Sequence, residues 1–431
     1  MLAAIGVRSI DELFTDVPAH VRFPELSLPP AISELEVRGE LETLASINLT
    51  TTENPCFLGA GAYNHFVPAV VDAVLRRGEF ATAYTPYQPE VSQGTLQAIF
   101  EYQSMICALT GMEVANASHY DGATATAEAV IAAVNIQRLK RRKVAMSPWL
   151  HPEYRAVVRT YTQGMGLSLI GDDGADEPTA ALDADTACLI VQYPDFLGRF
   201  SDLGPLAKAA HAVGALLIVV ADPIALGLLK PPGAFGADIV VGEGQGLGAG
   251  LNFGGPYLGF FATRKEHVRR MAGRLVGQTV DSAGERGFVL TLSTREQHIR
   301  RDKATSNICT NQGLVALAAA VYMAALGRCG MRRVAELCYH RAHYAAQRID
   351  ELPGYTVRRE KPFFKEFAVR CPWPAADINE ELLQEWGIIG GYNLGRNYAH
   401  LQDHLLLCVT EMNPREEIEL LVDALSEIAQ A

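Results

Sequence analysis

The stretch GAFGADIVVGEGQGLGAGLNFGGPYLGFFA, residues 233–262, decides the fold of this 431-residue chain. Residues 238–241 (DIVV) predict a short buried strand, because β-branched and apolar side chains dominate there. Residues 257–262 (YLGFFA) predict a second strand, and a glycine-rich crossing joins the two. The crossing contains no lysine. We therefore expect an irregular loop between two core strands that offers no side-chain amine.

Around this stretch, short apolar segments alternate with helical ones. Strands that are apolar on both faces and separated by helices indicate a mostly parallel sheet with helices on both sides, an α/β fold. Ligands in such sheets bind beyond the carboxyl ends of the strands. Asp121, Asp222 and the loop 242–255 fall at these ends. The predicted strands are 144–146, 168–170, 186–192 and 216–220, and the predicted helices are 122–140, 153–163 and 203–213.

The chain is predicted to have three parts. Residues 1–50 form an arm that four prolines interrupt, with helical periodicity only at 33–45. An arm of this kind must lie against another surface to be ordered, which points to a subunit interface. Residues 51–327 form a large domain and residues 328–431 a small α+β domain. The elements expected outside the central sheet are helices 64–78, 313–327, 331–352 and 415–428 and strands 355–358 and 364–370.

The composition is that of a globular protein with a large core. Apolar residues make up 49% of the chain and charged residues 20%. The net charge of −12 argues against a nucleic-acid or anionic-membrane binder. No secretory signal opens the chain, and the apolar runs 212–221 and 314–327 are too short to cross a bilayer. Eight scattered cysteines without a CxxC pair predict free thiols, no metal site and a cytoplasmic protein.

Residues 83–94 (AYTPYQPEVSQG) form a segment that cannot be a regular helix, because prolines interrupt it. Tyr84, Tyr87 and Gln88 lie between these prolines. Rigid backbone holds hydroxyl and amide groups in place, as a binding site requires. The alternative interpretation is a rigid loop with surface tyrosines. Ser92 is expected to cap a helix that runs through Ile106. We call residues 84–94 the tyrosine loop.

Five motifs resemble the glycine cleavage system P-protein, or glycine decarboxylase, in the form of its amino-terminal half or first subunit. The similarity extends over the whole chain. It implies the fold of pyridoxal-phosphate (PLP) dependent aminotransferases (fold type I), with a small C-terminal α+β domain. In many bacteria this family is split into two similar polypeptides, and only the second carries the cofactor lysine. The motifs are FLGAGAYNHFVPAVV (57–71), YTPYQPEVSQG (84–94), MEVANASHYDGATATAEA (112–129), FGGPYLGFFATR (253–264) and RDKATSNICTNQ (301–312).

The resemblance places the cofactor lysine at position 246, which here is a glycine preceded by Gln245. Asp222 stands where this fold holds the pyridine nitrogen, although it could equally be a strand-end aspartate that caps a turn. Lys303 is the alternative candidate for the imine-forming lysine, because the residues ATSN follow it. The other interpretation of Lys303 is a solvated cation in a loop. The other lysines are assigned to helices, other loops or the small domain: 140, 143, 208, 230, 265, 361 and 365.

The N-terminus of the helix after Asp121 could hold a phosphate, because helix N-termini expose free N–H groups. A helix dipole stabilises an anion by about 0.3–1 kcal/mol, or about 2 when partly buried. Two like charges about 4 Å apart repel by about 4 kcal/mol at an effective dielectric of about 20. The repulsion between Asp121 and a phosphate therefore outweighs the stabilisation by the helix dipole. We expect Asp121 to cap the helix and the cofactor pocket of this chain to hold no PLP.

The resemblance implies a non-PLP-linked subunit of a heteromeric glycine decarboxylase. A catalytic second subunit holds the PLP, glycine is decarboxylated, and its aminomethyl group passes to the lipoyl arm of the H-protein. Tyr84, Tyr87 and Gln88 are expected to line the partner's glycine pocket. Thr305, Ser306 and Asn307 are expected to hydrogen-bond towards the partner's PLP or a carboxylate; the alternative for them is capping of the next helix. The rival functions are an autonomous PLP enzyme that uses Lys303 and a regulatory pseudoenzyme.

Overall fold

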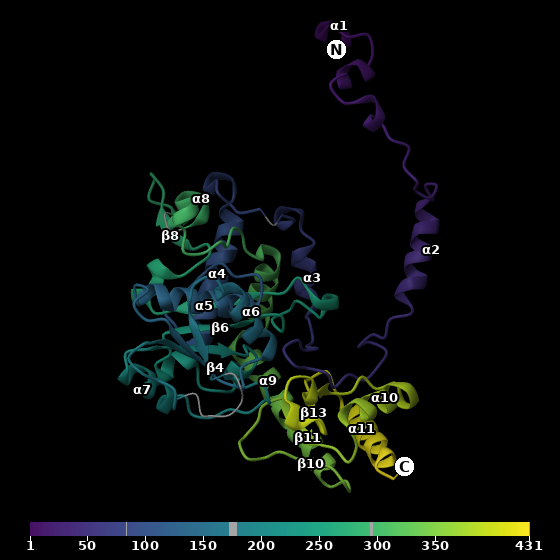
Figure 1. Cartoon of the computed structure of the whole chain (residues 1–431), viewed down its shortest axis with the longest axis vertical. Helices are drawn as coiled ribbons and strands as arrows, with labels where there is room; N and C mark the ends of the chain where they lie inside the picture. The colour runs from purple at the N-terminus through teal and green to yellow at the C-terminus, as the bar shows by residue number, and fades with distance from the viewer. Residues whose placement is uncertain (83, 172–178, 294–295, 431) are drawn as a thin grey trace. The chain divides into compact units, whose positions relative to one another are not determined.

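The computed structural model describes residues 1–82, 84–171, 179–293 and 296–430. These residues form two compact units, Met1–Glu53 and the chain from Asn54 onwards (Figure 1). The predicted arm ended at residue 50, close to the division at Glu53. The predicted boundary between residues 327 and 328 stays a prediction, because both sides of it lie in one unit.

The arm contains two α-helices, α1 (Leu2–Ile5) and α2 (Glu34–Ala45). A capping box starts α2 as the sequence predicts: the Glu36 amide donates to Ser33 Oγ, and the Ser33 amide donates to Glu36 Oε2. None of residues 1–53 is buried, and Leu35, Leu41 and Leu44 of α2 are exposed. The arm therefore has no core of its own.

A seven-stranded sheet forms the centre of the second unit. Its strand order is β1-β7-β6-β5-β4-β2-β3. Strands β2 to β6 pair in parallel, while β7 pairs antiparallel with both β6 and β1. The mostly parallel sheet is confirmed. The strands are β1 (Val114–Ala115), β2 (Lys143–Met146), β3 (Ser168–Ile170), β4 (Thr186–Tyr193), β5 (Leu216–Ala221), β6 (Ile239–Glu243) and β7 (Gly259–Thr263).

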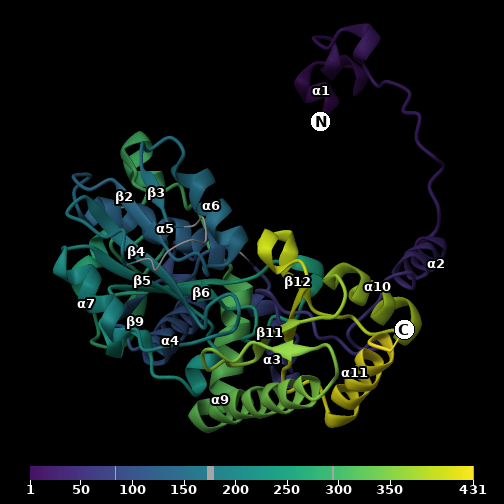
Figure 2. The ribbon, with the colours of Figure 1, turned by 60° about the horizontal axis from the view of Figure 1, so that its bottom comes forward.

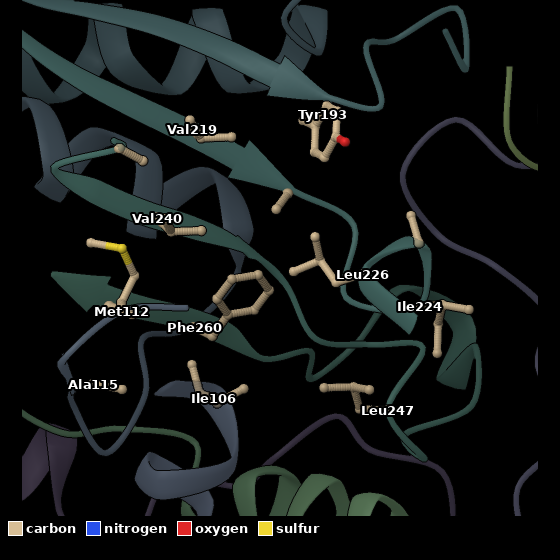
Figure 3. Packing of buried hydrophobic residues seen from close by; sticks show 14 of the residues in the cluster. Ile106, Met112, Ala115, Tyr193, Val219, Ile224, Leu226, Val240, Leu247 and Phe260 are labelled. Carbon is tan, nitrogen blue, oxygen red and sulfur yellow. The ribbon is translucent and has the colours of Figure 1, made fainter. Parts of the chain in front are cut away.

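Both faces of this sheet are buried, which explains the unbroken apolar runs of its strands. Leu217 and Val219 of β5 belong to one core cluster, while Ile218 and Val220 belong to another. Figure 3 shows the first cluster, where Val219 lies near Val240 and Phe260 of the neighbouring strands. Helices lie on the two sides of the strands (Figure 2). They include α4 (Gln93–Thr110) and α9 (Gly313–Asp350) on the first face, and α5 (Gly122–Ile136) and α6 (Pro152–Thr162) on the second.

Several helices differ from the prediction. Helix α5 ends at Ile136 rather than at residue 140. Helix α3 spans only Ala69–Leu75, because residues before it are held elsewhere: the Phe66 amide donates to Glu411 Oε1. Helix α4 begins after Ser92, but the Ser92 side chain makes no capping hydrogen bond. Helix α7 (Gly204–Ala212) is one residue shorter at each end than predicted.

Helix α9 joins two predicted helices into one element of 38 residues. The joint is Gly327, whose φ of 58° and ψ of −174° break the helical geometry. By length and composition α9 could cross a membrane. The length argument from the sequence was therefore wrong. Its apolar residues are instead accounted for by packing, because Ala316, Ala319 and Tyr322 lie in the core against the central sheet.

The C-terminal part of the second unit has a four-stranded antiparallel sheet in the order β10-β11-β13-β12. The end of α9 packs against it with α10 and α11 around one core cluster. The sequence predicted β10, β11 and α11 but missed the others. The elements are β10 (Thr356–Val357), β11 (Glu366–Arg370), α10 (Ala375–Trp386), β12 (Tyr392–Asn393), β13 (His404–Cys408) and α11 (Arg415–Ile428).

Two further elements that the sequence did not predict lie between β7 and α9. A hairpin pairs β8 (Val276–Val280) with β9 (Arg286–Leu290), and a short helix α8 (Gln297–Arg300) follows. Gln93, at the start of α4, bonds both the amide and the carbonyl of Phe288 in β9. The hairpin therefore holds the start of α4, where the tyrosine loop ends.

Candidate functional site

A pocket lies beyond the carboxyl ends of β5 and β6, where the sequence places a ligand site. Asp222 follows β5, and Gly246 belongs to the glycine-rich crossing after β6. Side chains from distant segments complete it. We call it the strand-end pocket, and its lining includes Tyr63, His151, Asp222, Glu243, Gly246 and Lys365.

Lys365 occupies the position next to Asp222. Its Nζ lies 2.8 Å from Asp222 Oδ2 and 3.4 Å from the centre of the Tyr63 ring. Burial alone would lower the pKa of Lys365, but the Asp222 carboxylate outweighs burial and the pKa is raised. Burial would likewise raise the pKa of Asp222, whereas the Lys365 charge lowers it. The two groups are therefore an ion pair, and Asp222 already has its cation.

The Lys365 ammonium also fixes the protonation of His65. Lys365 Nζ lies 3.1 Å from His65 Nε2, and because an ammonium can only donate, Nε2 must accept. The proton of neutral His65 is then on Nδ1, which lies 2.8 Å from Glu411 Oε2. Burial opposes the charge of Glu411, yet the hydrogen bond from His65 lowers the pKa of Glu411 to about 2. A charged chain of hydrogen bonds thus runs from Asp222 to Glu411.

The same chain brings together three possible metal ligands, His65, Cys338 and Glu411. The sequence predicted no metal site. In the structure the Cys338 thiol donates to Glu411 Oε2 at 3.2 Å, so the two side chains already satisfy each other. Lys365 places a positive charge against His65. This arrangement favours a hydrogen-bonded network over a cation site.

The N-terminus of α5 carries two carboxylates. Asp121 caps the helix as predicted, with the Thr124 amide donating to Asp121 Oδ1 at 2.7 Å. Glu243 takes the first helix amide: Gly122 N donates to Glu243 Oε2 at 2.9 Å. Amides of Gln245 and Leu258 donate to Glu243 Oε1, while burial raises the pKa of Glu243 to about 7. Two of the N–H groups that a phosphate would use, those of Gly122 and Thr124, are therefore already bonded to carboxylates.

The side chain of Gln245 holds the glycine-rich crossing in place. Gln245 accepts from the Tyr63 amide and donates to the Tyr63 and Gly250 carbonyls. Beside it, a Cβ added at Gly246 would lie 3.0 Å from His65 Cδ2. No larger side chain fits at position 246 without movement of His65.

The tyrosine loop lies at the surface. Tyr84 is 77% exposed and Tyr87 42% exposed, and Gln88 is also exposed. The rings of Tyr84 and Tyr87 meet edge to face, with centroids 5.8 Å apart. The Tyr87 hydroxyl accepts a hydrogen bond of 2.6 Å from Arg274 Nη2. Ala83, which the predicted segment included, lies outside the described residues.

Residues 305–307 lie on the approach to α9 but do not cap it. The N-cap of α9 is Gln312, so the capping alternative was wrong. Thr305 and Ser306 are half-buried and Asn307 is exposed. Ser306 Oγ accepts a hydrogen bond from the Ile308 amide. Burial raises the pKa of Glu128 to about 7, although a hydrogen bond from Ser306 acts to lower it. Lys303 is exposed in the same segment, away from the lining of the strand-end pocket.

Comparisons with known proteins identify the family. The family model described as the glycine cleavage system P-protein matches residues 1–425. The chain belongs to the glycine cleavage system P-protein family. A relative from Thermomicrobium roseum, named probable glycine dehydrogenase (decarboxylating) subunit 1, is 58% identical over 99% of this chain and 96% of its own length. A relative of the same name from Desulforamulus reducens is 52% identical over 100% of this chain and 97% of its own length.

Solved structures confirm the fold of this P-protein family member. An inhibitor-bound glycine decarboxylase (P-protein) superposes with a TM-score of 0.93 at 47% identity, and the match covers 99% of this chain and 97% of that one. A sphingosine-1-phosphate lyase from Burkholderia pseudomallei superposes with a TM-score of 0.68 at 16% identity, which shows the fold alone. The predicted fold type I of PLP enzymes is confirmed.

The strand-end pocket of this P-protein family member does not fit PLP. A PLP enzyme of this fold needs an imine-forming lysine, a free carboxylate for the pyridine nitrogen and free amides for the phosphate. Here position 246 is glycine, Asp222 is paired with Lys365, and Glu243 takes the first amide of α5. The open volume of the pocket is about 40 Å³, enough for a few water molecules.

Several residues that line the strand-end pocket were not predicted from the sequence as site residues. Lys365 was assigned to the small domain and given no role, and nothing near it in the chain points to Asp222. Glu243 lies within residues 233–262, two residues after the predicted strand 238–241. Its position at a strand end could have indicated a role in the pocket. His151 also lies in the pocket, where its Nε2 is 2.8 Å from the Ala60 carbonyl and its ring stacks on Tyr154.

Proposed function

We propose that this chain is the subunit of a heteromeric glycine dehydrogenase (decarboxylating) that holds no PLP of its own. A second subunit, similar in fold, binds the cofactor. The composition of the strand-end pocket carries this proposal, because Gly246, the Lys365–Asp222 pair and Glu243 each oppose one requirement of the cofactor. The names of the two relatives, both subunit 1, support it.

In the proposed complex, glycine loses its carboxylate as carbon dioxide and its aminomethyl group passes to the lipoyl arm of the H-protein. The cofactor of the second subunit supplies the electron sink for decarboxylation when bound. This chain contributes polar groups to that site. The tyrosine loop supports this role, because it holds exposed hydroxyl and amide groups on a proline-stiffened backbone. Thr305, Ser306 and Asn307 form the second set of polar groups that this chain contributes to the partner's site.

An exchange assay tests the division between subunits. Glycine–bicarbonate exchange is measured with this chain alone, the second subunit alone and both together, each with PLP and lipoylated H-protein. We expect exchange only in the mixture. Exchange by this chain alone would show an autonomous enzyme, and full exchange by the second subunit alone would show a regulatory or scaffolding role.

A cofactor measurement tests the pocket separately. The purified chain is titrated with PLP, treated with borohydride and analysed by mass spectrometry. We expect no imine absorbance band and no reduced adduct at Lys303 or Lys365. The second subunit treated in the same way serves as the positive control. An adduct at either lysine of this chain would overturn the proposal.

A further inference from the structure

Arg274 is a buried arginine outside the strand-end pocket. It lies between β7 and β8 and is 2% exposed. Its guanidinium forms an ion pair with the buried Glu296 and donates to the Cys309 carbonyl. A buried charge is retained at a cost unless its partners are close and well oriented. Arg274 thus connects the segment before α9 to the core.

The same guanidinium reaches the tyrosine loop. Arg274 Nη2 donates to the Tyr87 hydroxyl at 2.6 Å, and the guanidinium carbon lies 5.4 Å from the centre of the Tyr87 ring. The ring of His298 meets Tyr87 edge to face at 5.8 Å. Tyr87 is therefore held on several sides while 42% of it stays exposed.

The bond between Arg274 and Tyr87 has only one possible direction. A guanidinium has donors and no acceptor, so the phenol oxygen must accept. The Tyr87 hydroxyl keeps its own proton, which must point away from Arg274. A phenol held in this way is a fixed donor for an acceptor outside the chain. Tyr84 differs, because its hydroxyl has no hydrogen bond among the described residues and its ring is 77% exposed.

We propose that Arg274 is a positioning residue that makes the Tyr87 hydroxyl a hydrogen-bond donor to the carboxylate of glycine in the partner's site. This inference rests on the proposed function. It names the substrate group that Tyr87 recognises and the residue that orients Tyr87. Glycine is small, and its carboxylate is the anionic group available for recognition by a neutral donor of this kind. Arg274 itself does not touch the substrate.

The test uses the complete complex with the second subunit and H-protein. Tyr87→Phe removes the donor, Arg274→Lys removes the fixed geometry but keeps the charge, and the double variant combines them. Arg264→Lys is the matched control, because Arg264 also bonds a carboxylate and backbone carbonyls but lies away from the tyrosine loop. Kinetic constants for glycine and the melting temperature of each complex are measured.

We expect Tyr87→Phe to raise the KM for glycine about tenfold or more, because a hydrogen bond to a charged group is lost from the bound state. Arg274→Lys raises the same KM by a similar or smaller factor. The double variant is no worse than Tyr87→Phe, since Arg274 acts through Tyr87. Arg264→Lys keeps the wild-type KM. A purely structural Arg274 would instead lower the amount of active complex and leave the KM unchanged.

Three outcomes overturn the inference: an unchanged KM in Tyr87→Phe, an unchanged KM in Arg274→Lys, or losses that multiply in the double variant. If Arg274→Lys does not fold, Tyr87→Phe and Tyr84→Phe decide, since both leave the Arg274–Glu296 pair intact. A larger KM increase for Tyr87→Phe supports the inference and equal increases contradict it. An inactive wild-type mixture would refute the proposed function, whereas an active mixture that is indifferent to Tyr87 refutes only this inference.

Discussion

The strand-end pocket and the tyrosine loop use polar side chains in opposite ways. In the pocket, Asp222, Lys365 and Glu243 are bonded to other groups of the same chain. In the loop, Tyr84, Tyr87 and Gln88 are exposed. The polar groups of the pocket are taken up by internal contacts, while the loop exposes groups that another molecule can reach. Under the proposed function, the groups of this chain that recognise another molecule are therefore those of the exposed loop rather than those of the strand-end pocket.

This comparison predicts that changes in the pocket affect stability and changes in the loop affect activity. The largest effect is expected from Lys365→Met. It leaves Asp222 without its cation in a buried site, which costs about 3–5 kcal/mol of the free energy of unfolding. The double variant with Asp222→Asn removes both charges and should recover most of the loss. Urea unfolding measures both, and a loss below about 1 kcal/mol for Lys365→Met would contradict the role of the pair.

Gly246→Ala sharpens the comparison at the place of the missing lysine. The added Cβ would lie 3.0 Å from His65 Cδ2, so His65 must shift against its bonds to Lys365 and Glu411. We expect a loss of about 1–3 kcal/mol in the free energy of unfolding. Gly164→Ala is the control, because a Cβ there meets open space. Equal stability of the two variants would show that the pocket is not tightly packed.

Glu366→Gln tests, through pH, a buried carboxyl group that bonds the pocket residue Tyr63. Glu366 accepts from the Ala60 amide and the Tyr63 hydroxyl, and burial raises its pKa from 4.5 to about 7. The folded state therefore holds the proton more tightly than the unfolded state. The wild type should lose about 1–3 kcal/mol relative to Glu366→Gln as pH rises from about 4.5 to about 7. Melting curves across this range measure the difference, and parallel curves would contradict it.

Tyr84→Phe gives the smallest expected change in stability. The Tyr84 ring is 77% exposed, so the free energy of unfolding should change by less than about 0.5 kcal/mol. Exchange activity of the complex should still fall by roughly two- to tenfold, the value of one neutral hydrogen bond. Chemical unfolding and glycine–bicarbonate exchange on the same preparation separate the two effects. A stability loss as large as that of Gly246→Ala would break the contrast between pocket and loop.

In the central sheet the sequence predicted the strands well, because burial there is two-sided, whereas it missed β13 although both faces of that strand are also buried. Strands β4 and β5 were placed within one residue, because both faces of the central sheet select continuous apolar runs. The β8–β9 hairpin and strands β12 and β13 were missed. The β8 strand (VGQTV) is mostly exposed, with Val280 64% exposed, so it carries no continuous apolar run.

The pocket could be predicted only in part. The absence of lysine at position 246 and the cap at Asp121 are local facts of the sequence, and both hold in the structure. The cation beside Asp222 is not local, because Lys365 immediately precedes β11 of the other sheet. Arg274 likewise reaches Tyr87 across the fold. Side chains that meet from distant segments leave no periodic trace in a single sequence.

The close approach of His65 to Gly246 has an evolutionary consequence. A mutation that places an amine-bearing side chain at this position meets the His65 imidazole already in place. Removing that imidazole first would strip Glu411 and Lys365 of a shared hydrogen-bond partner. We therefore expect that an amine at position 246 would need coordinated changes at both positions rather than one substitution.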